Sequence, residues 1–169
     1  MNKDILLQIA INFFKELLEF FDNSEVRTLS EIEAELSRIM KAFVRELIKA
    51  YIQIADEAIL KDKSSRKERG LVVERRDDKR SVYTIFGDIS FKRTYYFDKS
   101  HKKYVYPLDE ALRLDKRQRL SKTVTVKLVE TAGQVSYAKS SMNVTEGELS
   151  KQTVKNKIHS LNLEALKVE

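Results

Sequence analysis

Residues 29–62 carry the longest regular pattern of apolar side chains in the chain, and this pattern restricts the fold more than any other feature. Apolar residues recur there in steps of three and four with one stutter, which predicts one long α-helix. Thr28 and Glu31 have the spacing of a capping box at its start. At 1.5 Å per residue the helix is roughly 50 Å long. The apolar positions are Leu29, Ile32, Leu36, Ile39, Phe43, Leu47, Tyr51, Ile54 and Ala58.

Residues 3–22 repeat the same helical period, with a wide apolar face that includes four phenylalanines. We therefore expect residues 1–62 to form an antiparallel helical hairpin. The first helix is too short to cover the second along its whole length. The remainder needs cover from a second chain or from the rest of this one, and a homodimer through these helices is one expectation.

Residues 71–106, within an expected domain at 63–106, change to a period of two, which indicates strands. The polar stretch 61–70 is interpreted as a solvated connector or domain boundary. We expect a small antiparallel sheet whose aromatic residues form core and cross-strand pairs rather than platforms for nucleic-acid bases. The expected strands are 71–74, 81–86, 89–97 and 104–106, with turns at Asp77-Asp78 and Gly87-Asp88 and a stop at Pro107.

Residues 107–169 return to helix. A short helix at 108–114 precedes three more, at 122–132, 136–142 and 150–160, and Ser121 and Ser150 stand at cap positions. Two short helices with a tight connection, preceded by a third, are typical of a helix-turn-helix unit. The expected fold class is therefore α+β, mainly α, with a helical hairpin, a small sheet and a C-terminal trihelical unit.

The helix at 150–160 is the candidate recognition helix. Val154, Ile158 and Leu161 would face the core, which leaves a polar face that can reach base edges and phosphates. The alternative is an ordinary amphipathic helix with a solvated polar face. The expected contacts with DNA on this helix are Lys151, Gln152, Lys155, Asn156 and His159. Contacts with phosphate, which position rather than specify, are expected from Lys122, Lys127, Lys139, Arg117 and Arg119.

Charge is divided unevenly along the chain. Residues 1–62 hold 8 Lys/Arg and 12 Asp/Glu, and residues 63–169 hold 24 and 14, so a net charge of −4 precedes one of +10. The basic part is the one that phosphates attract. The chain has no cysteine and 2 histidines, which excludes thiolate chemistry and disfavours a metal site. We expect no cofactor, no metal and no membrane segment, and a cytoplasmic location.

Four blocks resemble the N-terminal region of the Lre-type bacterial insertion-sequence transposases, many of which are known only as an uncharacterised protein family. The blocks are residues 86–96, 104–112, 135–137 and 149–157. The resemblance implies DNA transposition, with a DNA-recognition part, able to bind transposon ends, that precedes an RNase H-like domain with three metal-binding carboxylates. Relatives with a zinc-ribbon hairpin carry cysteines in its knuckles, and the loop from Phe97 to Tyr104 has none.

These features predict a DNA-binding region of a truncated transposase that is not an enzyme by itself. Two-metal phosphoryl transfer needs several converging carboxylates, and the acidic pairs of the basic part are Asp77-Asp78 and Asp109-Glu110. We interpret the first pair as a turn and the second as a helix N-terminus. The alternative function is a non-catalytic helical module for protein interaction, in which the basic half is only solvated.

Overall fold

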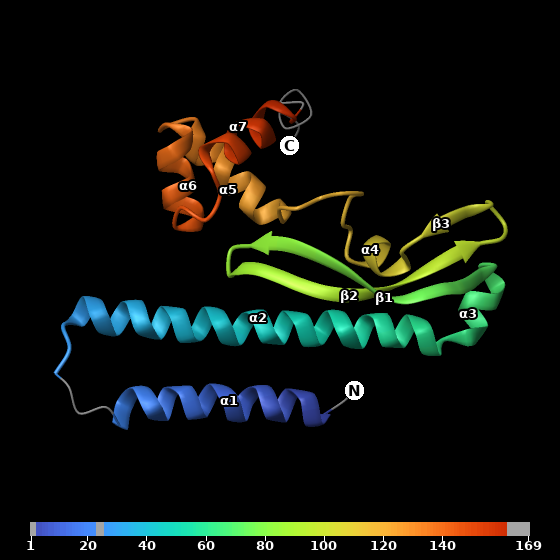
Figure 1. Cartoon of the computed structure of the whole chain (residues 1–169), viewed down its shortest axis with the longest axis horizontal. Coiled ribbons are helices and arrows are strands. Elements are labelled where there is room, and N and C mark those ends of the chain that lie inside the picture. Colours follow the sequence, from blue (N-terminus) through green and yellow to red (C-terminus); the bar gives the residue numbers. More distant parts are fainter. Residues whose placement is uncertain (1–2, 23–25, 162–169) are drawn as a thin grey trace. The chain divides into compact units, whose positions relative to one another are not determined.

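The computed structural model describes residues 3–22 and 26–161, and these divide into two compact units. Unit 1 comprises residues 3–22, 26–81 and 88–118, and unit 2 comprises 82–87 and 119–161. Helices predominate, and the described strands form a single small sheet (Figure 1). The α+β, mainly α class expected from the sequence is confirmed. The tip of the first β-hairpin belongs to unit 2 although it interrupts unit 1 in sequence.

Two antiparallel helices, α1 (Lys3–Asp22) and α2 (Leu29–Lys61), open unit 1. The predicted capping box is present, because Glu31 N donates to Thr28 Oγ1 at 3.4 Å and Thr28 N donates to Glu31 Oε2 at 2.7 Å. The hydrogen bond from the Thr28 backbone lowers the pKa of Glu31. Phe13 and Phe43 stack at 4.2 Å between ring centroids, which joins the two helices.

The single apolar seam expected along α2 is wrong at three positions, because Leu29, Tyr51 and Ala58 are all exposed. Tyr51 is 67% exposed and Leu29 is 71% exposed, whereas Ala50 and Ile52 are buried. The reason lies in what covers the helix. Helix α1 packs on α2, and so does the short helix α4 (Pro107–Ala111), so the covered side of α2 changes along its length. One straight apolar stripe along α2 cannot face both α1 and α4.

Helix α3 (Lys63–Glu68) lies within the polar stretch at 61–70 that was expected to be a solvated connector, and none of its residues is buried. Asp62 caps it, because Ser65 N donates to Asp62 Oδ1 at 3.0 Å. Gly70 follows in the left-handed region at φ +66°, where an L side chain is strained. The Gly70 carbonyl then accepts from Lys99 N at 3.0 Å.

The sheet consists of β1 (Leu71–Thr84), β2 (Gly87–Asp98) and β3 (Lys103–Val105), in that order, and β2 and β3 are antiparallel. All of it except the hairpin tip belongs to unit 1. The expected turn at Asp77-Asp78 is wrong, because β1 runs through it without interruption. Asp77 adopts φ 64° inside the strand. Asp78 accepts two hydrogen bonds from the Arg75 guanidinium, at 2.7 and 2.8 Å, and one from Tyr106. The composition of this stretch suggested a turn, but the paired Asp78 carboxylate lies within a continuous strand.

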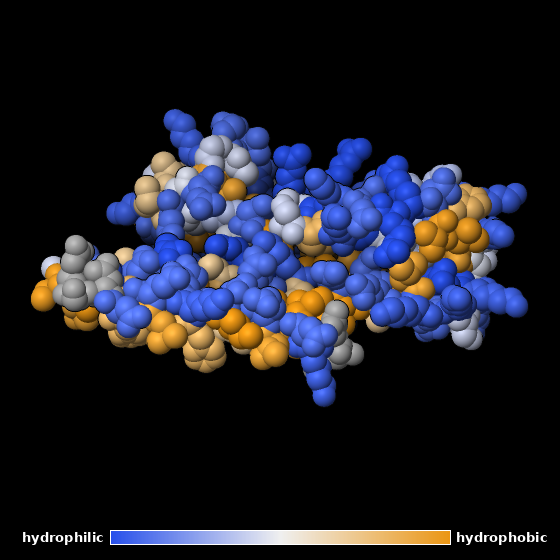
Figure 2. Space-filling view, turned by 60° about the horizontal axis from the view of Figure 1, so that its bottom comes forward, coloured by the Kyte–Doolittle hydropathy of each residue, from blue (hydrophilic) through white to orange (hydrophobic). Residues whose placement is uncertain are grey.

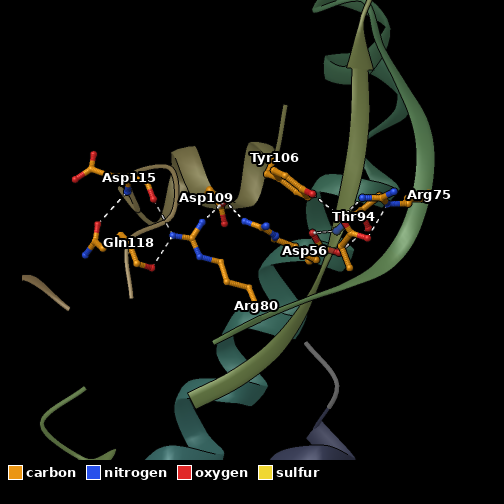
Figure 3. Close-up of polar contacts among 10 residues, drawn as sticks. Asp56, Arg75, Arg80, Thr94, Tyr106, Asp109, Asp115 and Gln118 are labelled. Atoms are coloured by element: carbon orange, nitrogen blue, oxygen red, sulfur yellow. Dashed lines mark hydrogen bonds and ion pairs between the residues drawn. The ribbon is translucent and has the colours of Figure 1, made fainter. Parts of the chain in front are cut away.

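Strand β2 buries Ile89 and Phe91 and then Thr94, Tyr96 and Asp98, so the buried positions shift from odd to even numbers. Strict alternation along the strand would place Thr94 and Tyr96 on the polar face. At Thr94 the buried side is polar, because Asp56 of α2 accepts from Thr94 N at 3.0 Å and from Thr94 Oγ1 at 2.7 Å (Figure 3). One carboxylate of the long helix therefore satisfies the backbone and the side chain of a central strand residue.

Helix α4 ends at Ala111, earlier than the expected Leu114. Its Asp109 is buried and accepts from both Arg80 of β1 and Arg93 of β2 (Figure 3). Arg80 also donates to the Asp115 carbonyl at 2.8 Å, which holds the segment after α4. The Arg93 guanidinium lies 3.5 Å from the centroid of the Tyr106 ring. These contacts attach α4 to the sheet by a buried ionic cluster.

Unit 2 consists of α5 (Lys122–Ala132), α6 (Tyr137–Thr145), α7 (Lys151–His159) and the hairpin tip. All three predicted helices are present, and each of them packs on the other two. Tyr83 of the tip joins the segment before α5, because Tyr83 N donates to the Arg119 carbonyl and Ser121 N donates to the Tyr83 carbonyl, both at 2.8 Å. The hairpin tip is therefore part of the helical unit.

Candidate nucleic-acid interface

Helix α7 separates a buried apolar side from an exposed polar side. Ser150 caps it as predicted, because Thr153 N donates to Ser150 Oγ at 3.1 Å. Val154 is fully buried and Ile158 packs against the same core. The residues expected to face outward on the first two turns are exposed: Lys151, Gln152, Lys155 and Asn156.

The core of unit 2 holds α7 in place. Val154 meets Val124 and Leu128 of α5 and Leu120 before it, and the exposure of these four side chains is 5% or less. Such close packing along one side of a helix prevents the helix from turning about its own axis. The polar face of α7 is therefore presented by a fixed core.

Three small polar residues of α6 fix the connection to α7. Ser140 Oγ donates to the Leu128 carbonyl at 3.2 Å, so α6 lies close to α5. Ser141 Oγ donates to the Leu149 carbonyl just before α7, and Leu149 N donates to Thr145 Oγ1 at 3.4 Å. None of the three was predicted from the sequence. The four-residue spacing of Ser141 and Thr145 was the available signal, since it places both on one side of α6.

The turn between α6 and α7 contains consecutive left-handed residues. Glu146 adopts φ 53° and caps the C-terminus of α6, and Gly147 adopts φ 83°. A glycine shortly after a helix end is the common way to reverse the chain, because it accepts positive φ without strain. Helix, left-handed turn and second helix together have the connectivity of a helix-turn-helix.

Two side-chain pairs organise the polar face of α7. Gln152 Nε2 donates to Asn156 Oδ1 at 2.7 Å. His159 is exposed, but its Nε2 lies 3.2 Å from the Tyr137 hydroxyl of α6, and the two rings meet edge to face. Gln152 and Asn156 are therefore presented as one amide pair, whereas the imidazole of His159 contacts α6.

The basic residues predicted to contact phosphate are all exposed, but they are distributed over several segments. Lys122 and Lys127 lie on α5, Lys139 lies on α6, and Arg119 precedes α5. Arg117 belongs to unit 1, where it adopts φ 63°. Unit 2 thus carries nine of the ten predicted site residues.

The charge of unit 2 suits an anionic partner. Its described residues contain seven Lys/Arg and three Asp/Glu, a net charge of +4. Lysine ammonium groups neutralise phosphates, and carboxamides such as those of Gln152 and Asn156 can pair with adenine edges. Both kinds of group lie on the exposed face of α7.

Tyr83 and Tyr137 are two further residues of the unit that were not predicted to belong to its core. Both pack against that core, and the Tyr83 hydroxyl donates to the Thr145 carbonyl at 3.4 Å. Tyr83 lies 37 residues before Leu120, to which it is joined as a short parallel bridge. No local pattern signals such a contact.

The acidic residues considered for catalysis have structural partners instead. Burial raises the pKa of Asp109, and the guanidiniums of Arg93 and Arg80 oppose this shift. Asp78 is bound by Arg75 and Tyr106. Within the described parts of the chain, no group of three or more His, Asp or Glu is placed to hold a metal ion. None of the described helices is long and apolar enough to cross a membrane.

Comparison with known proteins gives one family. Residues 23–169 match the family described as "Uncharacterised protein family (UPF0236)". A UPF0236 protein of Caldanaerobacter subterraneus subsp. tengcongensis is 39% identical over 161 residues, which cover 94% of this chain and 34% of the relative. A second one from this organism, 38% identical over 161 residues with the same coverage, has a name that joins eleven gene designations.

A UPF0236 protein of Streptococcus gallolyticus, named for the vanSb 3' region, is 30% identical over 129 residues, which cover 75% of this chain and 28% of the relative. No solved structure matches. The chain thus spans about a third of the length of these curated relatives.

Proposed function

Because this chain belongs to the uncharacterised protein family UPF0236, we propose that it is the DNA-binding region of an insertion-sequence transposase-like protein. The observation that carries the proposal is the exposed face of α7. Lys151, Gln152 and Lys155 point away from the core in which Val154 is buried. In a helix-turn-helix the second helix enters the major groove and presents such side chains to base edges.

Two further observations support this proposal. Unit 2 has an excess of basic residues on each of its helices, as non-specific attraction to phosphates requires. One relative also has a name that joins eleven gene designations in a single organism. A protein encoded many times in one genome is what the copying of a mobile DNA segment produces. This points to transposon ends as the DNA and to the bacterial cytoplasm as the place of action.

No catalytic step is proposed for these residues. In the transposases that the chain resembles, an RNase H-like domain supplies the carboxylates, and the chain spans about a third of its relatives. The proposed roles are restricted to binding. Lys151 and Lys155 neutralise phosphates, Gln152 and Asn156 read bases, and His159 holds α7 to Tyr137.

The test is a salt titration of binding to a random-sequence DNA duplex of about 30 base pairs, measured by fluorescence anisotropy. We expect binding at about 50 mM salt, with an affinity that falls linearly on a logarithmic scale as salt rises. Replacing Lys151 and Lys155 by alanine should lower the magnitude of that slope by about 2, since each phosphate contact contributes about 0.9.

The matched control replaces Lys49 and Lys61 of α2 by alanine, which removes the same charge from exposed ion pairs of unit 1. This variant should retain the full slope. Absence of binding at low salt would overturn the proposal. Equal slopes for the two double variants would favour the alternative, a helical interaction module whose basic half is only solvated.

A further inference from the structure

Helix α1 carries an apolar stripe that no described part of unit 1 covers. Five large side chains recur in steps of four and three residues and are exposed by 40% to 70%: Leu7, Ile11, Phe14, Leu18 and Phe21. The opposite side of α1 packs on α2, through contacts such as Phe13 on Phe43. No residue of α1 is fully buried. The helix thus has two apolar sides, and only one is covered.

The spacing of the stripe is that of a coiled-coil seam. Positions 7, 11, 14, 18 and 21 alternate as d and a of a heptad, and this repeat keeps a seam facing a partner helix. A helix needing cover on one side only would carry one such stripe. Figure 2, in which the side of α1 comes forward, shows hydrophobic atoms in a band along this edge.

The exposed apolar area of the stripe alone supplies most of what a stable interface buries. At about 200 Å² for each large apolar side chain, the exposed fractions of the five residues sum to roughly 600 Å². On α2, Leu29, Met40 and Tyr51 are 50% to 71% exposed as well. A stable interface buries about 800 Å² on each partner, whereas the largest apolar patch of a typical monomer is about 300–600 Å².

We propose that this stripe binds the same stripe of a second copy of the chain. In an antiparallel pair related by a two-fold axis, Ile11 faces Phe14 of the other copy and Leu7 faces Leu18. Each a position then meets a d position, and the seam is complementary to itself. The two helical hairpins join as a four-helix arrangement. The inference goes beyond DNA binding and does not depend on it.

The test is the molar mass of the full chain in solution, by sedimentation equilibrium from about 1 to 100 μM. We expect a dimer, twice the 19.7 kDa of the single chain. Phe14→Glu and Leu18→Glu place a charge in the seam and should each raise the dimer dissociation constant at least about 100-fold. Both positions are 61% exposed, so the fold should persist, which far-UV circular dichroism checks.

Asn12→Glu is the control, because it adds the same charge to an exposed position of α1 outside the stripe. It should dimerise as the parent does. A single-chain mass for the parent at 100 μM would overturn the proposal and leave the stripe to a different partner. A dimer that persists in both seam variants would overturn it also. The mass is read without DNA, so neither outcome bears on the salt-dependent binding.

Discussion

Gln152 Nε2 donates a 2.7 Å hydrogen bond to Asn156 Oδ1 one turn further along α7. Both amides lie on the exposed face of the helix, and the bond holds them as one group. A pair that is ordered before binding loses less side-chain entropy when it meets a base edge. This relationship separates the residues expected to read sequence from the lysines expected to hold phosphates.

The first prediction concerns sequence readout. Replacing Gln152 and Asn156 by alanine should lower the preference for a selected duplex over a random one by about 1–3 kcal/mol for each bidentate pairing with a base that the change removes. The salt slope should not change, because neither side chain carries charge. Selection from a random pool followed by competition binding measures this. Thr123→Ala, at an exposed position of α5, is the control. An unaltered preference would remove these amides from readout.

The second prediction concerns the core under α7. Val154→Ala removes two methyl groups from a side chain with 0% exposure and leaves a cavity beside Leu128, so it should destabilise unit 2 by about 2–3 kcal/mol. Urea unfolding measures the loss. Val126→Ala makes the same chemical change at a side chain that is 49% exposed, and it should cost less than about 0.5 kcal/mol. Similar losses in both variants would contradict the core assignment.

The third prediction concerns the turn before α7. Gly147 has φ +83°, and an added Cβ would lie 3.3 Å from Met142 Cε. Gly147→Ala should therefore destabilise the chain by about 1–2 kcal/mol. Gly133→Ala is the matched control, because Gly133 has φ −70° and room for a Cβ. It should be neutral or stabilising by up to about 1 kcal/mol. Thermal unfolding compares them, and the opposite order would show that the turn does not require glycine.

The fourth prediction concerns acid. The hydrogen bond from Arg75, followed by that from Tyr106, lowers the pKa of Asp78 below its ordinary value of 3.8. The resulting stability is fully present above the unfolded pKa and is lost as the pH falls through the folded one. The Asp78→Asn variant should therefore be less stable than the parent at pH 7. The difference in their free energies of unfolding should disappear as the pH falls below about 3.8.

Urea unfolding between pH 2.5 and 7 measures this gap. Asp4→Asn, which removes a carboxylate at an exposed position of α1, provides the comparison for a general change in charge. A gap between the Asp78 variant and the parent that stays constant from pH 7 to pH 2.5 would exclude the pairing with Arg75 as its cause.

The fifth prediction concerns the ionic cluster under α4. Asp109→Ala leaves Arg80 and Arg93, whose side chains are 8% and 13% exposed, without their carboxylate. Removing one member of a buried pair costs about 3–5 kcal/mol. The neighbouring Glu110→Ala breaks only an exposed pair with Arg69, and should cost less than about 1 kcal/mol. Denaturant unfolding of the two variants provides the test, and equal costs would place Asp109 outside the core.

Features encoded within one helical turn could be predicted from the sequence. The caps at Thr28, Ser121 and Ser150 are present, and so is the burial of Val154 on α7. Each depends on residues three or four positions apart, a distance that helix geometry determines. The exposed face of α7 follows from the same period, so most of the candidate interface could be identified in advance.

Features that depend on distant partners could not be predicted. Asp77-Asp78 has the composition of a turn, but Tyr106 and Arg75 bind Asp78 and β1 continues through it. The contact between His159 of α7 and the Tyr137 hydroxyl of α6 is likewise absent from any local pattern. In both cases a tyrosine 22 or more residues away takes part.

By itself, the sequence determined the helices other than α3, the caps at Thr28, Ser121 and Ser150, and the polar face of α7. Repeats of three and four residues define helical faces regardless of what those faces pack on. Only the tertiary structure decided that Tyr83 joins the trihelical core, that Asp109 is buried between two arginines, and that the stripe from Leu7 to Phe21 is left uncovered. A periodic apolar pattern indicates which side of a helix must be buried. What covers it depends on contacts between residues far apart in the chain.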